Sequence, residues 1–344
     1  MIGLLLLILI SFFTVAILSV PFINLLYKIK FQRQNQQTRD MFNKRTPIFD
    51  KFHAHKAGTP LGGGVLVIFS VVVLFLLVGL FREVFNIEST SVYPYAQEVF
   101  IILFSVVSFA ILGLVDDVRK TFQLKKTSFF GLRFRQKFLI QVALAAFISS
   151  YLYFVLKIDI VNLRFIDVFH IGPLFIPFAM FVIVSFVNAV NIADGLDGLA
   201  GGLLLIALIA FLMISSSILD TTLSSFLGLW IGALIAFLYF NIYPARIWMG
   251  DAGALGFGAG LAITGLLLGK TPALAIICGM FVVEVSSSLL QLISKRFFHR
   301  KLIEAAPLNL YLQHKGWPEP KIVMRYWLAG ILLAVMGLLL AFIG

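Results

Sequence analysis

The stretch of residues 188–202 places amides and carboxylates at regular intervals between two long apolar runs. Asn188, Asn191 and Asp194 recur every three residues, so on a helix they would share one face. Asp197 continues this spacing, although intervening glycines predict that the helix loosens there. A carboxylate at membrane depth is costly and usually faces a bundle interior or a watery cavity. The spacing therefore favours a site for phosphate, sugar or metal over a plain polar loop between two membrane helices.

Further carboxylates lie in two short motifs. Asp116 and Asp117 are adjacent and are followed by Arg119 and Lys120. Paired carboxylates beside cations suit a magnesium–phosphate site, and adjacent carboxylates raise one another's pKa, so that one can act as a base. A solvated helix end is the simpler interpretation of this motif. Asp251 lies beside a glycine, which permits the close approach of a metal ion or a ligand.

Cationic and aromatic residues near these motifs could bind the rest of a nucleotide. Lys56 precedes the glycines 62–64, which either approach a phosphate or begin a close-packed membrane helix. Lys137 ends a basic stretch that either binds pyrophosphate or anchors a span. Trp248 offers a flat face for a base, or else lies at the membrane interface. Glu284, inside an apolar run, is expected to face the bundle interior and form a structural hydrogen bond.

The composition shows what kind of scaffold must position these residues. The chain has 344 residues, of which 60% are hydrophobic and 12% charged, and a mean hydropathy of +1.02. These values exclude a water-soluble domain of this size. We expect one all-α, polytopic membrane domain covering residues 1–344. Its ten predicted spans lie at 2–27, 62–81, 99–115, 138–156, 174–190, 199–219, 224–241, 253–269, 272–293 and 323–343.

The distribution of basic residues predicts the orientation of these spans. If residues 28–61 are cytoplasmic, 23 of the 27 Lys and Arg residues fall on the cytoplasmic side. The positive-inside rule then places both termini outside and every motif described above on the cytoplasmic side. Anchoring to an anionic bilayer accounts for the net charge of +11, so nucleic acid is not expected as a partner. The first apolar run is expected to be a span and not a removable signal peptide, and the single cysteine, Cys278, is expected to be a buried thiol.

Taken in order, these motifs resemble the phospho-N-acetylmuramoyl-pentapeptide transferase family, within the polyprenyl-phosphate sugar-1-phosphate transferases. The matching stretches are His53 with Lys56 to Pro60, the pair Asp116 and Asp117, Asn188 to Gly198, Gly250 with Asp251, and Lys315 to Glu319. The resemblance implies transfer of phospho-MurNAc-pentapeptide from UDP-MurNAc-pentapeptide to undecaprenyl phosphate. The expected products are lipid I and UMP, in a Mg²⁺-dependent step of peptidoglycan synthesis at the bacterial plasma membrane.

The resemblance also implies roles for single residues. Asp251, with Asp194, would hold Mg²⁺, and Asp116 and Asp117 would activate the lipid phosphate. The remaining implied roles concern substrate binding. Lys56 and Lys137 would hold phosphates, Asp197 would contact uridine, and Trp248 would stack on uracil. Asn188 and Asn191 would line the nucleotide site.

One segment departs from the family pattern. The family usually has three consecutive histidines where this sequence has Asn309, Leu310 and Tyr311. His314 follows three residues later and is a candidate to reach the substrate from a neighbouring turn. We expect the enzyme to be active, because phosphoryl transfer depends mainly on positioning and charge neutralisation.

Other interpretations of the sequence stay open. A transferase that moves another UDP-N-acetylhexosamine 1-phosphate to a polyprenyl phosphate would need the same carboxylates. A secondary transporter could use buried carboxylates as ion sites, although the two halves of the chain share no motif. An inactive membrane scaffold is a further alternative, and a homodimer is compatible with each of these functions.

Overall fold

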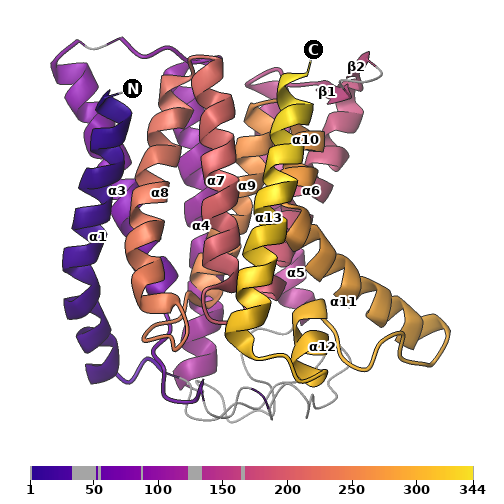
Figure 1. Cartoon of the computed structure of the whole chain (residues 1–344). Coiled ribbons are helices and arrows are strands. Elements are labelled where there is room, and N and C mark those ends of the chain that lie inside the picture. Colours follow the sequence, from indigo (N-terminus) through magenta and orange to yellow (C-terminus); the bar gives the residue numbers. More distant parts are fainter. Residues whose placement is uncertain are drawn as a thin grey trace.

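The protein is described by a computed structural model that covers residues 2–32, 52, 56–86, 88–122, 134–163 and 167–343 (Figure 1). Its long helices are α1 (Ile2–Lys28), α3 (Gly63–Val84), α4 (Tyr95–Phe122), α5 (Phe134–Phe154), α6 (Phe175–Ala193), α7 (Leu199–Ser217), α8 (Thr221–Asn241), α9 (Gly250–Leu267), α11 (Gly279–Phe297) and α13 (Glu319–Phe342). The shorter elements are β1 (Ile160–Leu163), β2 (Asp167–His170), the 3₁₀ turn η2 (Gly172–Leu174), α10 (Thr271–Ile277) and α12 (Leu308–His314).

The helices have the length and composition of membrane spans. Within the described ranges, nine helices are long and apolar enough to cross a bilayer, and α10 with α11 forms a tenth, bent candidate. The prediction of an all-α polytopic membrane protein with about ten spans is therefore confirmed. Both chain ends lie at the same end of the bundle in Figure 1, as an even number of spans requires.

The ninth predicted span, 272–293, is not a single straight helix. It divides at Cys278 into α10 and α11, whose axes differ by 80°. In Figure 1, α11 leans away from the bundle, while α10 stays within it. The residues on both sides of the break are apolar, so hydropathy alone does not distinguish a bent helix from a straight one.

A small hairpin joins α5 to α6. Strands β1 and β2 are antiparallel, and Ile160 pairs with His170 at the open end. The hairpin lies at the same end of the bundle as both termini, away from the predicted motifs (Figure 1). Within the described part of the chain it is the only β-sheet. The sequence did not indicate it.

Helix α9 lies at the centre of the bundle, and its small residues allow neighbouring helices to come close. A Cβ atom added to Gly64 of α3 would lie 2.2 Å from the Cα atom of Gly253 in α9. A Cβ atom added to Gly113 of α4 would lie 2.1 Å from the backbone oxygen of Asp251. Such backbone contact is the usual role of small residues between membrane helices. It brings the C-terminal end of α4 against the N-terminal end of α9, where the predicted carboxylates lie.

The glycines 62–64 take part in this packing. Gly63 and Gly64 donate their backbone N–H groups to the carbonyl oxygens of Trp248 and Met249, at 2.8 and 2.9 Å. Trp248 in turn donates its backbone N–H to the carbonyl oxygen of Pro60, at 2.9 Å. Of the two interpretations of this glycine cluster, the close-packed start of a membrane helix is the one that matches these contacts.

Candidate active site

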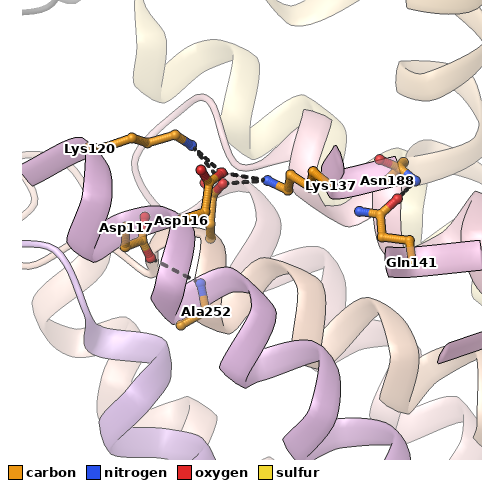
Figure 2. A network of polar contacts seen from close by, with 8 residues as sticks. Asp116, Asp117, Lys120, Lys137, Gln141, Asn188 and Ala252 are labelled. Carbon is orange, nitrogen blue, oxygen red and sulfur yellow. Dashed lines mark hydrogen bonds and ion pairs between the residues drawn. The ribbon is translucent and has the colours of Figure 1, made fainter. Parts of the chain in front are cut away.

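Two carboxylates from different helices share two lysines at one end of the bundle. Lys137 of α5 places its Nζ atom 3.0 Å from Asp116 Oδ2 and 2.6 Å from Asp251 Oδ2. Lys120 of α4 places its Nζ atom 2.9 Å from Asp116 and 2.7 Å from Asp251. Figure 2 shows the two lysine side chains reaching the carboxylate of Asp116 from opposite sides. Two negative and two positive groups therefore form a compact, nearly neutral cluster.

Asp117 points to a different partner from its neighbour. Its Oδ2 atom accepts a hydrogen bond of 3.0 Å from the backbone N–H of Ala252, in the first turn of α9 (Figure 2). A carboxylate at a helix N-terminus is stabilised by the unpaired N–H groups there. Gly250 has a φ of +76°, and a Cβ atom there would lie 2.8 Å from Asp117 Oδ2. Glycine at this position thus permits the contact between Asp117 and the start of α9.

Asp194 lies just past the end of α6, near the same cluster. Burial raises the pKa of the Asp194 carboxyl group to about 7, and the nearby carboxylates of Asp251 and Asp117 add to the increase. The prediction that carboxylates from separate motifs converge on one end of the bundle agrees with this arrangement.

The donor set of this cluster suits a magnesium ion. Mg²⁺ prefers oxygen ligands and is commonly held by one or two carboxylates, with waters and substrate phosphates completing its coordination. Asp251 and Asp194 are close enough for their charges to interact. Among the described residues, no three His, Cys, Asp or Glu side chains could hold a metal ion by themselves. Two carboxylates are a donor set of the kind that Mg²⁺ shares with waters and a substrate phosphate.

The two amides of α6 lie in different surroundings. Asn188 donates its side-chain N–H groups to Gln141 Oε1 of α5, at 2.9 Å, and to the carbonyl oxygen of Val184, at 2.8 Å. Gln141 is buried and lies one turn after Lys137 on α5 (Figure 2). Asn188 thus connects α6 to the helix that carries Lys137. Asn191 is partly exposed on the same helix.

Lys56 and Asp197 lie together in a second, buried group of charges. Lys56 Nζ is 2.8 Å from Asp197 Oδ1 and 2.5 Å from Glu319 Oε1. Asp197 Oδ2 also accepts a hydrogen bond of 3.0 Å from the backbone N–H of Ala245. Trp248 is anchored through its backbone to residues 60–63, and its ring is partly exposed.

The residues around the positions of the family's histidines lie in different environments. Asn309 is buried and lies close to Gly195, the residue that follows Asp194. A Cβ atom added to Gly195 would lie 3.3 Å from the Nδ2 atom of Asn309. Leu310 is buried in the apolar core, and the ring of Tyr311 faces Lys315. His314 has its Nε2 atom 3.5 Å from the exposed side chain of Glu304. Of the three positions where the family has histidines, Asn309 is the one whose side chain contacts the turn after α6.

The sequence pattern assigned no individual role to three residues of these groups, Lys120, Gln141 and Glu319. Lys120 was noted as a neighbour of Asp116, but its spacing of one helical turn could have identified it as a partner. Glu319 was noted as part of a motif, yet its contact with Lys56 joins distant parts of the chain and leaves no local signal. Gln141 follows Lys137 by one turn in an otherwise apolar helix, which is a recognisable signal. Glu284 behaves as expected: it is fully buried and accepts hydrogen bonds from the Tyr326 hydroxyl and the Asn309 backbone. His53 lies outside the described residues.

Comparison with known proteins identifies the family. A model of glycosyl transferase family 4 matches residues 99–269. A phospho-N-acetylmuramoyl-pentapeptide-transferase of Thermodesulfovibrio yellowstonii is 34% identical and is aligned over 96% of this chain and 91% of its own length. Proteins of the same name from Clostridioides difficile (32% identical, 97% of this chain and 96% of that protein) and Borrelia turicatae (34%, 83% and 82%) are also similar. The chain therefore belongs to the phospho-N-acetylmuramoyl-pentapeptide-transferase family, in agreement with the resemblance of its motifs.

Proposed function

We propose that this chain transfers phospho-MurNAc-pentapeptide from its UDP-linked donor to undecaprenyl phosphate, which gives lipid I and UMP. The observation that carries this proposal is the cluster in which Asp116 and Asp251 share Lys120 and Lys137, with Asp117 and Asp194 beside it. The relatives, which match over nearly the whole chain, bear the name of the same activity.

The reaction forms one phosphorus–oxygen bond and breaks another. An oxygen of the lipid phosphate attacks the phosphorus that carries the sugar, and the bond to the uridine-bearing phosphate breaks. UMP leaves with the electron pair, so the products form without another co-reactant. Both reactants are anions, and the site must therefore neutralise charge and align the attack.

The lysines and carboxylates of the cluster supply this environment. Lys120 and Lys137 can turn from their carboxylate partners to phosphate oxygens, because each is held at the edge of the cluster with partial exposure. Asp251 and Asp194 would hold Mg²⁺, which when bound neutralises charge on the pyrophosphate of the donor. Asp116 and Asp117 are the candidates to accept a proton remaining on the lipid phosphate. A phosphate monoester is largely dianionic at neutral pH, with a second pKa of about 6, so charge neutralisation matters more than a base.

The nucleotide is proposed to bind beside the turn after α6. Asp197 lies in this turn, and the partly exposed ring of Trp248 is anchored nearby through its backbone. Trp248 would stack on uracil, since aromatic side chains bind bases through their flat faces. Asn188 and Asn191 would line the same side of the site from α6.

The proposed site faces the cytoplasm and the inner leaflet. The positive-inside distribution of Lys and Arg supports this orientation. UDP-linked donors are cytosolic solutes, and the acceptor's lipid tail lies in the bilayer, so a site at the end of the bundle meets both.

The test is a reconstitution with purified protein. UMP release and lipid-linked product are measured with undecaprenyl phosphate, Mg²⁺ and either UDP-MurNAc-pentapeptide or UDP-GlcNAc. We expect product with the first donor only. Product with UDP-GlcNAc alone would assign the chain to another envelope glycan, and no product with either donor would overturn the proposal.

A further inference from the structure

Glu319, the first residue of α13, connects two residues that lie far apart in the sequence, Lys56 and Asp197. Its Oε1 atom accepts a hydrogen bond of 2.5 Å from Lys56 Nζ and one of 2.6 Å from the backbone N–H of Asp197. Lys56 also donates to Asp197 Oδ1, at 2.8 Å. The side chains of Lys56, Asp197 and Glu319 are 5%, 7% and 6% exposed. These contacts form a closed, buried triangle, called here the Lys56 clamp.

The Lys56 clamp fixes three segments of the chain at the proposed nucleotide site. Asp197 belongs to the turn that also holds Asp194, and it accepts the backbone N–H of Ala245 in the loop before Trp248. Lys56 precedes residues 60–64, whose backbone pairs with Trp248 and Met249. Glu319 attaches both segments to the start of α13, where an acidic residue is favoured by the helix dipole.

Within the clamp, Lys56 uses most of its hydrogen-bond donors on protein carboxylates. Two of the three N–H donors of its ammonium group are used by carboxylates. Two carboxylates against one ammonium give the clamp an excess negative charge, which repels phosphate. Buried charges are costly unless they are paired, so removing the ammonium would leave two carboxylates facing each other in a buried site.

We infer that Glu319 is a positioning residue for the nucleotide-binding turn, and that Lys56 acts with it in the clamp and not as a phosphate ligand. This inference rests on the proposed function. It also explains why the motifs from Lys56 to Pro60 and from Lys315 to Glu319 occur together in this chain: one supplies the cation and the other its carboxylate.

A double variant distinguishes the two possible roles of Lys56, as the cation of the clamp or as a phosphate ligand. Lys56→Gln leaves Asp197 and Glu319 without their cation, so KM for the UDP-linked donor should rise about tenfold or more, as expected for losing a hydrogen bond to a charged group. Glu319→Gln keeps an oxygen for the Asp197 N–H and leaves the pair of Lys56 and Asp197 intact, so its effect should be smaller. In the double variant, Glu319→Gln relieves the repulsion that Lys56→Gln creates. The double variant should therefore bind the donor better than Lys56→Gln alone.

The experiment measures kcat and the KM for each substrate, together with the thermal midpoint, for the natural protein, both single variants and the double variant. Glu304→Gln is the matched control, because Glu304 is an exposed carboxylate of the same end of the bundle that pairs with Lys315. We expect the KM for undecaprenyl phosphate to stay unchanged in every variant, and Glu304→Gln to behave as the natural protein.

Two results would overturn the inference. If Lys56 binds phosphate directly, the double variant will be no better than Lys56→Gln in donor KM and in thermal midpoint. If Glu319→Gln and Lys56→Gln both match Glu304→Gln, the clamp does not position the turn. Failure of the proposed function can be distinguished from failure of this inference. In the first case the natural protein would form no product, and the order of the thermal midpoints of the variants would still test the clamp.

Discussion

Asp116 and Asp251 come from different helices, and their carboxylate oxygens are joined through the ammonium groups of Lys120 and Lys137. The contact between Gly113 and the backbone of Asp251 sets the distance between α4 and α9 at this point. The packing of two membrane helices therefore determines where the charges of the proposed site lie.

Removal of Lys137 should test the charge balance of this cluster. In Lys137→Gln, Asp116 and Asp251 lose one of their two shared cations, and the substrate phosphate that we propose Lys137 binds loses a cationic partner. We expect kcat to fall about 100-fold or more, the range typical of removing one electrostatic group from an active site. Steady-state kinetics checks this, with Arg135→Gln as the control because Arg135 is exposed on the same helix. Equal activity of the two variants would contradict the assigned role.

Enlargement of Gly113 should separate the two helices. The Cβ atom of Gly113→Ala would lie 2.1 Å from the backbone oxygen of Asp251, so α4 and α9 must move apart. Overpacking of this kind typically costs about 1–3 kcal/mol. We expect a lower thermal midpoint and a reduced kcat, whereas Gly3→Ala, which meets nothing within 4 Å, should change neither. A fully active Gly113→Ala variant would show that the spacing of the helices is not critical.

The departure from the family's histidines leads to predictions for Asn309, Leu310 and His314. Asn309→His places an imidazole beside the turn that holds Asp194, so turnover should gain a pH dependence near the ordinary histidine pKa of about 6.5. Leu310→His puts a polar ring into the apolar core and should lower the thermal midpoint. His314→Ala should be silent, because this ring lies beside the exposed Glu304.

A pH–rate profile and a thermal scan of each variant check these three expectations. If the natural chain forms no product and a chain with histidines at 309, 310 and 311 does, the natural protein is a pseudoenzyme. If His314→Ala abolishes turnover, the ring reaches the substrate despite its contact with Glu304.

Much of this arrangement could be predicted from the sequence. Long apolar runs determine the number of spans, because a bilayer requires about 20 apolar residues for each. Asp116, Asp117, Asp194 and Asp251 could be assigned to one end of the bundle, because the distribution of basic residues orients all the spans together.

Other features depend on contacts that a linear pattern does not contain. The pairing of Lys56 with Glu319 joins residues at opposite ends of the chain, and nothing near either residue specifies it. The bend at Cys278 lies between two apolar segments, so hydropathy does not mark it. The sequence also left two interpretations of glycines 62–64 open, because close helix packing and phosphate binding both favour residues without side chains.

A pair of carboxyl groups at the opposite end of the bundle predicts how stability depends on pH. Asp220 caps α8 by accepting the Leu223 N–H, and its carboxyl group lies close enough to that of the buried Glu98 to interact with it. Burial raises the pKa of the Asp220 carboxyl group above its ordinary value. Asp220 thus has a higher pKa in the folded protein than in the unfolded chain. At pH values between these two pKa values the folded protein binds more protons than the unfolded chain, so stability falls as pH rises through this range.

Asp220→Asn should reduce this dependence, because asparagine remains a good helix cap and does not titrate. The measurement is the thermal midpoint across a pH series, with Glu83→Gln as the control, since Glu83 is an exposed carboxylate of α3. An Asp220→Asn variant with the same slope as the natural protein would mean that Asp220 does not cause this pH dependence.

The most direct test of the account measures UMP release from UDP-MurNAc-pentapeptide with undecaprenyl phosphate by the natural protein and by Asp251→Asn. Asp251→Asn keeps the shape of the side chain but removes the charge that binds both lysines and would hold Mg²⁺. Asp159→Asn, which changes an exposed carboxylate near the hairpin, is the control. We predict that the natural protein and Asp159→Asn release UMP only when Mg²⁺ is present, and that Asp251→Asn is folded and inactive. Near-natural turnover by Asp251→Asn, or undiminished turnover of the natural protein in excess EDTA, would contradict it.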